Sequence, residues 1–433
     1  MTRNLARGVA VFCLGLALAG CGLASGHGSV STGEKYQAEG KYRAAYIEAK
    51  KVLQRDDKNG EAWLLLGQAS LMLGNPKDAM SDLDHARSHG VPEARWAVPV
   101  GRTLLVSQQF GEILKTLPAD LQAEPATRAR VDVLRGDAQR ALKQPDQAKQ
   151  SYDAALKLDP KASQALVGLA RLAEDTHDTD AANKYVEQAL AAASDNPQAW
   201  VAKGDLAFAG GDFAGAEANY DKALAIKNAD WLPQDAFYAR ARLVEAQTRQ
   251  SQYDKALANI DTMEKMAPEM PYTHYLHAVV LYQQGHLDDA VTQLQQVLKA
   301  APNNVPAQML MGAVNYAQAD YGQAEMNLSN VLGVDGQNVA ARKLLALTFY
   351  REGRSQQALG TLRPAVPGNP TDPELLALLQ RATAEGAGLP PSMEKQHAAG
   401  QAGQIAVATS APTGPFARVG EALAAGNLAE AIR

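Results

Sequence analysis

The sequence predicts an all-α solenoid in which helical hairpins repeat every 34 residues. Alanines recur with this period, as at Ala148, Ala182 and Ala216. Many are followed by a large apolar residue four positions later and a small residue three positions after that, and this spacing places all three on one helix face. Glycine and proline interrupt the pattern regularly, and no segment shows the two-residue alternation of a half-buried strand. We therefore expect a stack of helix pairs without a β-sheet.

The 34-residue period breaks at two joints. The alanine position slips by one residue before Ala148 and by six after Ala216, where residues 229–234 form an insertion. The third unit is irregular as well, since Asp120 stands where a small apolar residue belongs. We expect the stack to bend or loosen at these places. The positions in register are Ala45, Ala79 and Ile113, then Ala148, Ala182 and Ala216, then Ala256, Ala290, Ala324 and Ala358.

The two helices of a unit differ in their residues. The first carries a large residue followed by Leu-Gly, as in Trp63, Leu66 and Gly67, and the second carries the small-large-small pattern. A glycine lies between them, because a tight turn needs a left-handed residue. These turn glycines are Gly74, Gly211, Gly285 and Gly353. The pattern resembles the tetratricopeptide repeat. The resemblance implies a right-handed superhelix of about ten repeats over residues 34–385, with a continuous concave surface.

The N-terminus carries an export signal. Arg3 and Arg7 precede a short apolar run over residues 8–19, too short for a permanent membrane helix. The run ends in Leu-Ala-Gly before Cys21, which resembles a bacterial lipobox. This predicts a signal peptide over residues 1–20 and lipidation of Cys21. An ordinary cleaved signal with an incidental cysteine is the alternative.

The residue after Cys21 indicates the membrane. It is Gly22, whereas an aspartate there would favour retention at the inner membrane of many Gram-negative bacteria. We therefore expect a protein anchored by lipid to the outer membrane and facing the periplasm. Residues 21–33 are rich in Gly and Ser and are expected to form a flexible tether.

The C-terminal part changes in composition. Residues 386–415 are rich in Gly, Ala, Pro, Ser and Thr, which predicts a linker. Residues 416–433 then resemble the beginning of another repeat, so we expect further repeats to follow in the intact protein.

Composition and motifs argue against several classes of function. The net charge of −5 without a basic stripe does not favour nucleic-acid binding. No phosphate-binding loop, Gly-x-Ser-x-Gly elbow or His-Glu-x-x-His sequence is present, so we expect no catalytic residues and no cofactor. His274 and His277 fall on packing positions, and we expect no metal site.

Tyrosines that recur with the same period are the best candidates for a binding surface. They lie on first helices, at positions expected to face the concave groove, and each offers an apolar ring and a hydroxyl suited to a peptide or a sugar. Packing between repeats is the alternative role for them. The candidates are Tyr238, Tyr272, Tyr275, Tyr282, Tyr316 and Tyr350.

A more specific resemblance covers most of the chain. The lipobox at Cys21, the short tether, and the segments at residues 38–50 and 61–67 are similar to long tetratricopeptide lipoproteins encoded with exopolysaccharide and exosortase (PEP-CTERM) systems. The resemblance implies a non-catalytic periplasmic scaffold that binds protein partners in polysaccharide assembly or export, or in surface-protein sorting. A polysaccharide is a further candidate ligand.

Two other functions stay open on the sequence alone. One is an assembly factor for pili, secretins or outer-membrane proteins, although such lipoproteins are usually shorter. The other is the repeat region of a larger carbohydrate-active enzyme, with its catalytic part beyond Arg433.

Overall fold

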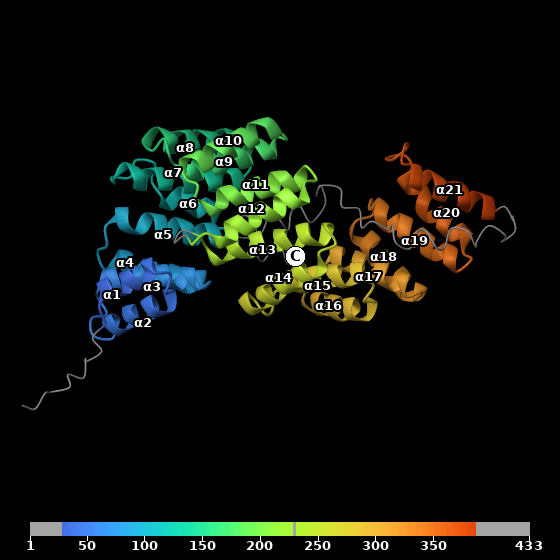
Figure 1. Ribbon diagram of the computed structural model, residues 1–433, viewed down its shortest axis with the longest axis horizontal. Helices are drawn as coiled ribbons and strands as arrows, with labels where there is room; N and C mark the ends of the chain where they lie inside the picture. The colour runs from blue at the N-terminus through green and yellow to red at the C-terminus, as the bar shows by residue number, and fades with distance from the viewer. Residues whose placement is uncertain (1–27, 228–230, 387–433) are drawn as a thin grey trace, which may run out of the picture.

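The computed structural model describes residues 28–227 and 231–386, and this part of the chain consists of helices and turns without a strand (Figure 1). Helices α1 to α20 follow one another as ten hairpins, and α21 packs on the tenth. The α-helices are α1 Val30–Ala38, α2 Tyr42–Leu53, α3 Gly60–Met72, α4 Pro76–Ser88, α5 Glu93–Val106, α6 Phe110–Thr116, α7 Pro125–Ala141, α8 Pro145–Leu158, α9 Ser163–Asp175, α10 Thr179–Ala192, α11 Pro197–Ala209, α12 Phe213–Ala225, α13 Pro233–Arg249, α14 Tyr253–Met266, α15 Pro271–Gln284, α16 Leu287–Ala300, α17 Val305–Ala317, α18 Tyr321–Val334, α19 Val339–Arg351, α20 Ser355–Leu362 and α21 Pro373–Gly386. A short 3-10 helix, Arg363–Ala365, follows α20.

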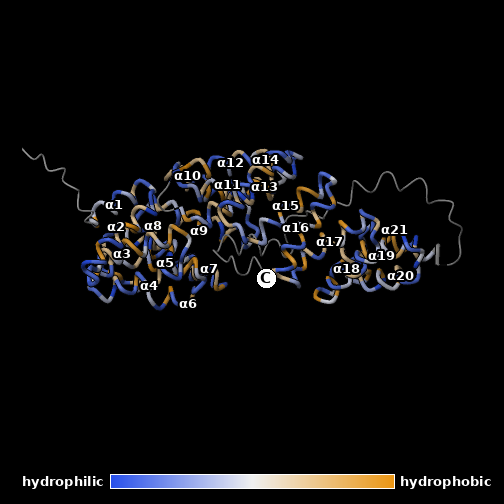
Figure 2. Tube along the Cα trace, turned by 90° about the horizontal axis from the view of Figure 1, so that it is seen from below, coloured by the Kyte–Doolittle hydropathy of each residue, from blue (hydrophilic) through white to orange (hydrophobic). Residues whose placement is uncertain are grey.

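The small-large-small positions of the second helices form the core, as the sequence predicts. Ala148, Tyr152 and Ala155 of α8 have no measurable exposure to solvent. Burying the large residue between small ones lets neighbouring helices approach closely, so hydrophobic burial runs along the whole stack. Figure 2 shows the matching alternation of apolar and polar stretches along the helices. Equivalent buried triplets are Ala79, Leu83 and Ala86; Ala182, Val186 and Ala189; Ala216, Tyr220 and Ala223; Ala256, Ile260 and Met263; Ala290, Leu294 and Val297; Ala324, Leu328 and Val331; and Ala358, Leu362 and Ala365.

Turns and caps fix the ends of the helices. Gly285 has φ +79°, and the other three turn glycines are left-handed too, which confirms the prediction for the turns between the helices. First helices often begin at an asparagine cap. The side-chain oxygens of Asn59, Asn304 and Asn338 each accept a hydrogen bond from the backbone N–H three residues later, at 2.9–3.0 Å.

The irregular third hairpin keeps its packing with a short helix. Helix α6 has only seven residues and ends before Asp120. Leu117 and Leu121 in the following loop are buried and complete the core there. The break in the repeat is therefore absorbed by a loop whose apolar side chains still pack.

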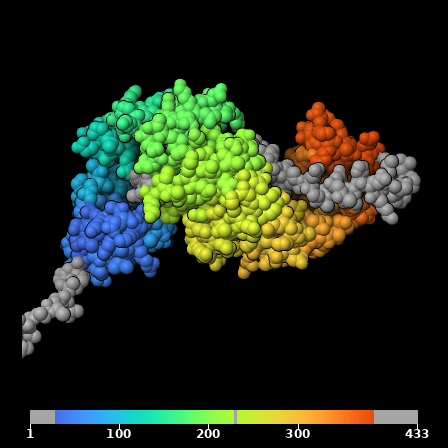
Figure 3. Space-filling view, in the orientation of Figure 1, coloured from blue at the N-terminus to red at the C-terminus, as the bar shows by residue number. Residues whose placement is uncertain are grey.

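Of the two expectations for the insertion after α12, bending and loosening, the described residues show a change of direction without loss of packing. The superhelix rises from the blue N-terminal helices to the green ones and descends again to the yellow ones (Figure 3). Leu232 thereby packs against Leu71, Met72 and Ala79 of α3 and α4, far earlier in the chain. Trp231 is buried as well. Because these apolar side chains gain burial across the superhelical turn, the insertion connects two distant parts of the stack.

Among the described helices, none has both the length and the apolar character needed to cross a membrane.

Candidate functional site

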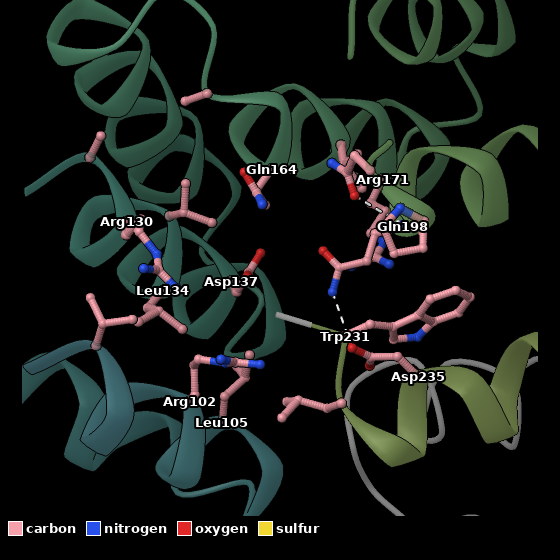
Figure 4. A pocket seen from close by; sticks show the side chains of 18 of the residues that line it. Arg102, Leu105, Arg130, Leu134, Asp137, Gln164, Arg171, Gln198, Trp231 and Asp235 are labelled. Atoms are coloured by element: carbon pink, nitrogen blue, oxygen red, sulfur yellow. Dashed lines mark hydrogen bonds between the residues drawn. The ribbon is translucent and has the colours of Figure 1, made fainter. Parts of the chain in front are cut away.

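A pocket with a volume of about 270 Å³ lies between the first helices of successive hairpins, α5, α7, α9, α11 and α13 (Figure 4). Trp231 and Leu232, directly before α13, and Gln234 and Asp235, in its first turn, form one of its walls. Side chains such as Val98, Leu134 and Leu232 supply the apolar lining. Arginine, lysine, aspartate, glutamine and asparagine side chains supply the polar lining, including Lys161 and Asp159 from the turn before α9. The pocket is therefore enclosed between the wall that the insertion contributes and the first helices of four earlier hairpins.

The polar lining follows the repeat period. Arg102, Asp137 and Arg171 occupy one position in three successive first helices, and Asp205 and Glu245 continue it in the next two. We call these five residues the first column. Opposite charges alternate along it from α5 to α11, so neighbouring helices attract rather than repel one another along this face.

A second column lies seven residues earlier on α7 to α15. Seven residues correspond to about two helical turns, so both columns share one face of each helix. Three residues of the second column, Arg130, Gln164 and Gln198, line the pocket together with three of the first. The second column comprises Arg130, Gln164, Gln198, Tyr238 and Tyr272.

Asp137 is positioned by a buried tyrosine. The Tyr152 hydroxyl donates a hydrogen bond to Asp137 Oδ1 at 2.8 Å. The Tyr152 ring lies against Gly136 and Gly168, where an added Cβ would come within 2.5 Å and 2.3 Å of ring atoms. Burial raises the pKa of Asp137, and the positive charge of Arg171 opposes that rise. The Tyr152 ring thus needs glycine at both positions 136 and 168. Its hydroxyl in turn holds the Asp137 carboxylate in place at the pocket.

Asp235 and Trp231 form the wall that the insertion contributes. Gln198 Nε2 donates to Asp235 Oδ2 at 3.2 Å. Burial raises the pKa of Asp235, while Arg171 and Arg102 favour its charged form. Trp231 is 9% exposed, and its Nε1 has no hydrogen-bond partner among the described residues. Leaving a buried donor unpaired costs free energy, and Trp231 therefore keeps this position at the expense of some stability.

Beyond the pocket, carboxylates of the first column bind tyrosines of the second. The Tyr238 hydroxyl donates to Asp205 Oδ2 at 3.1 Å, and the Tyr272 hydroxyl donates to Glu245 Oε1 at 2.6 Å. Arg242 joins the two carboxylates, with its Nε 3.3 Å from Asp205 Oδ1 and an ion pair to Glu245. These hydrogen bonds hold both rings flat against the inner face of the stack.

The six candidate tyrosines do not form one exposed surface, which corrects that expectation. Four are less than a tenth exposed and pack in the core, because hydroxyl partners and neighbouring repeats enclose them. Tyr282 and Tyr316 stay partly exposed, and a binding role for these two stays a prediction. The buried four are Tyr238, Tyr272, Tyr275 and Tyr350.

The histidines of α15 have protein partners. His274 Nδ1 lies 2.8 Å from Gln293 Oε1, and His277 Nδ1 lies 3.3 Å from Glu264 Oε1. Within the part of the chain that the structure describes, no group of three or more His, Cys, Asp or Glu side chains is arranged to hold a metal ion.

The sequence also contains a signal for the pocket, the regular spacing of charged residues on the first helices. The 34-residue spacing is as clear for Arg102, Asp137, Arg171 and Asp205 as for the alanines, once the one-residue slip before Ala148 is allowed. Polar residues at a repeating position of the first helix indicate an inner face, just as apolar ones indicate a core.

Two family models, both described as tetratricopeptide repeat, match the chain. One matches residues 36–97, 247–314 and 315–382, and the other matches residues 133–182 and 169–230. The chain belongs to the tetratricopeptide-repeat family. Such a repeat stack is a protein-interaction scaffold, of a kind that is typically non-catalytic.

Solved structures of low sequence identity resemble this tetratricopeptide-repeat protein. The APC/C hetero-tetramer Cut9-Hcn1 matches at 12% identity and a TM-score of 0.46, covering 81% of this chain and 95% of that chain. Yeast Tom70 matches at 15% identity and a TM-score of 0.40, covering 83% of this chain and 88% of that chain. Pseudomonas aeruginosa pilF matches at 21% identity and a TM-score of 0.35, covering 45% of this chain and 87% of that chain. No match was found among curated protein sequences.

Proposed function

We propose that this tetratricopeptide-repeat protein is a lipid-anchored scaffold of the bacterial outer membrane. It faces the periplasm and binds protein partners in exopolysaccharide assembly or export, or in exosortase-dependent sorting of PEP-CTERM surface proteins. The observation that carries the proposal is the lipobox at Cys21 directly before the repeat stack. Cys21 itself lies outside the described residues. The resemblance to the lipoproteins of these systems supports the specific role.

The anchor would hold the repeats close to the membrane. Residues 22–29 separate Cys21 from α1. Eight residues span at most about 30 Å even when fully extended. The first hairpin would therefore remain near the lipid headgroups, while the remaining hairpins extend away and present their inner face to partners.

Replacing the lipidated cysteine tests the anchor. Cys21→Ser should leave an unprocessed precursor and remove the protein from outer-membrane fractions. Cys13→Ser is the matched control, because Cys13 lies inside the signal peptide and its replacement should leave processing unchanged. Recovery of mature Cys21→Ser protein in the outer membrane would refute the lipoprotein assignment.

A crosslinked pull-down from native envelopes tests the scaffold role. We expect the wild-type protein to recover components of a polysaccharide-export or protein-sorting complex. Recovery of pilus or secretin subunits instead would contradict the proposed role and support an assembly factor. Turnover of a substrate by the purified chain would contradict a non-catalytic function.

A further inference from the structure

We propose that the pocket between α5 and α13 binds one acidic sugar unit of the uronic-acid type. The inference rests on the proposed function for the source of this ligand, an envelope polysaccharide. Its chemistry rests on the side chains that line the pocket. It assigns a small-molecule specificity to a stack that otherwise binds proteins.

The arginines indicate an anionic group on the ligand. Arg102, Arg130 and Arg171 come from three successive first helices and line the same space (Figure 4). A guanidinium offers paired donors in a fixed plane that matches a carboxylate. Guanidinium groups on three walls of one pocket therefore offer several positions at which a carboxylate could be bound.

The carboxylates of the pocket indicate that the rest of the ligand carries hydroxyl groups. Asp137 and Asp235 line the same pocket as the arginines. They would repel a second acidic group, so they disfavour an acidic peptide segment. A sugar hydroxyl, in contrast, donates to a carboxylate oxygen and accepts from a side-chain amide, and Gln164 and Gln198 supply such amides.

The insertion wall and the size of the pocket restrict the ligand to a single ring. Trp231 adds an apolar indole face. An indole suits a flat ligand with one apolar face and polar edges. A volume of about 270 Å³ lies just below the usual range of small-molecule pockets, roughly 300–1,000 Å³. One pyranose unit fits this description better than an extended chain.

Calorimetric titration of the purified full-length chain with D-glucuronic acid tests the proposal. D-glucose supplies the ring without the carboxylate, acetate supplies the carboxylate without the ring, and an Asp-Asp-Ala peptide represents the acidic-peptide alternative. We expect glucuronate to bind, glucose to bind roughly 10- to 100-fold more weakly because it lacks the charge-assisted hydrogen bonds, and acetate and the peptide to bind no more tightly than glucose.

Two pocket variants and one control locate the site. Arg171→Gln should reduce glucuronate affinity about tenfold or more, to the level of glucose. Gln164→Leu keeps the approximate size of the side chain but removes an amide from the lining, so it should weaken the binding of both sugars by a similar, smaller factor. Arg342→Gln on α19, outside the pocket, should change the affinity for neither sugar. Circular dichroism identifies any variant that fails to fold, and Gln164→Leu keeps the test valid if Arg171→Gln unfolds.

Several results would overturn the proposal. Equal binding of glucose and glucuronate would show that the arginines do not receive a carboxylate. Tighter binding of the peptide than of glucuronate would show that the pocket is a peptide site. Absence of binding by every probe would refute a ligand site. None of these results depends on lipidation or on the pull-down, so failure of the pocket assignment is distinguishable from failure of the proposed scaffold role.

Discussion

The repeats from α5 to α14 and those from α15 to α20 share one backbone plan but differ on their inner face. The core positions are alike in both regions. The repeat position that holds the first column, in contrast, is charged in the earlier repeats and apolar in the later ones, where Val279, Ala313 and Leu347 occupy it. A tetratricopeptide stack can therefore change what it binds at one position per repeat, without changing the positions that make it fold.

Polar contacts in the two regions differ in the same sense. In the earlier repeats, carboxylates lie on the inner face and are held by tyrosine hydroxyls. Ion pairs join neighbouring hairpins in both regions, as between Arg140 and Asp175 in the earlier repeats. In the later repeats, Lys343 Nζ lies 2.7 Å from Asp372, and Arg354 lies 2.5 Å from Glu325. Such partly exposed pairs contribute little to stability. The two regions thus differ in the tyrosine–carboxylate hydrogen bonds of the inner face and not in their ion pairs.

The largest expected effect comes from truncating the large core residue of the second helix in each region. Tyr152→Ala should cost about 3–5 kcal/mol, because it removes a fully buried ring and leaves Asp137 without its hydroxyl donor. Leu328→Ala, at the equivalent position of α18, should cost about 2–4 kcal/mol. Denaturant melts with local hydrogen exchange would measure both.

Each of these losses should stay within its own region, because hairpins contact mainly their neighbours and the long-range contact of Leu232 does not reach the later repeats. Tyr152→Ala should accelerate exchange in α7 to α10, and Leu328→Ala should do so in α16 to α19. Equal acceleration across both regions after either substitution would show that the two regions do not behave separately.

A smaller effect of opposite sign in the two regions is expected from one substitution, glycine to alanine. At Gly168 the added Cβ would meet the rigid Tyr152 ring at 2.3 Å, so Gly168→Ala should destabilise by about 1–3 kcal/mol. At Gly322 in α18 nothing lies within 4 Å, so Gly322→Ala should stabilise by up to about 1 kcal/mol through helix propensity. Thermal melts that move in the same direction for both would contradict the close packing around Tyr152.

The smallest expected effect is a pH dependence confined to the charged region. Burial, with smaller contributions from the negative charges of Asp205 and Asp175, raises the pKa of Glu174 to about 7, although the positive charges of Arg171 and Arg140 oppose the rise. The folded protein therefore binds a proton at Glu174 that the unfolded chain releases near its ordinary pKa of 4.5. Stability from this group is complete below pH 4.5 and is lost as the pH rises through about 7.

Glu174→Gln should remove this loss. The stability of the variant minus that of wild type should increase between pH 5 and pH 8 by on the order of 1 kcal/mol. A shift of one pKa unit corresponds to about 1.4 kcal/mol, and the expected effect is smaller than the full shift would give because solvent reaches the side chain. Glu325→Gln in the later repeats is the control and should show no such change between the two pH values. Parallel pH profiles for Glu174→Gln and wild type would contradict the assignment.

The sequence predicted the repeat architecture well because each hairpin is specified locally. Ala148, Tyr152 and Ala155 are fixed by helix geometry, and Gly285 by the turn it must make, so period and residue type were sufficient. The pocket needed information that no single repeat contains. Leu232 finds its partners on α3 and α4 only after the superhelix has turned back on itself.

The tyrosines show the limit of the same reasoning. Tyr238 and Tyr272 were correctly placed on first helices, but their burial depends on Asp205 and Glu245, the carboxylates that accept from their hydroxyls. Residue type at a repeating position therefore predicts the face of a helix. The exposure of that residue depends on its neighbours in the adjacent repeats, which the spacing of one residue type does not describe.

Hydrogen exchange on Leu232→Asp tests most directly whether residues 231–235 close the earlier repeats around the pocket. The substitution places a charge in an apolar cluster, where it is strongly disfavoured. Amides of α3 to α5 and of α13 should then exchange faster, while those of α16 to α20 stay unchanged. Leu142→Asp, at a position 39% exposed, is the matched control and should leave all of these amides as in wild type. Unchanged exchange in α3 to α5 after Leu232→Asp would contradict the closure.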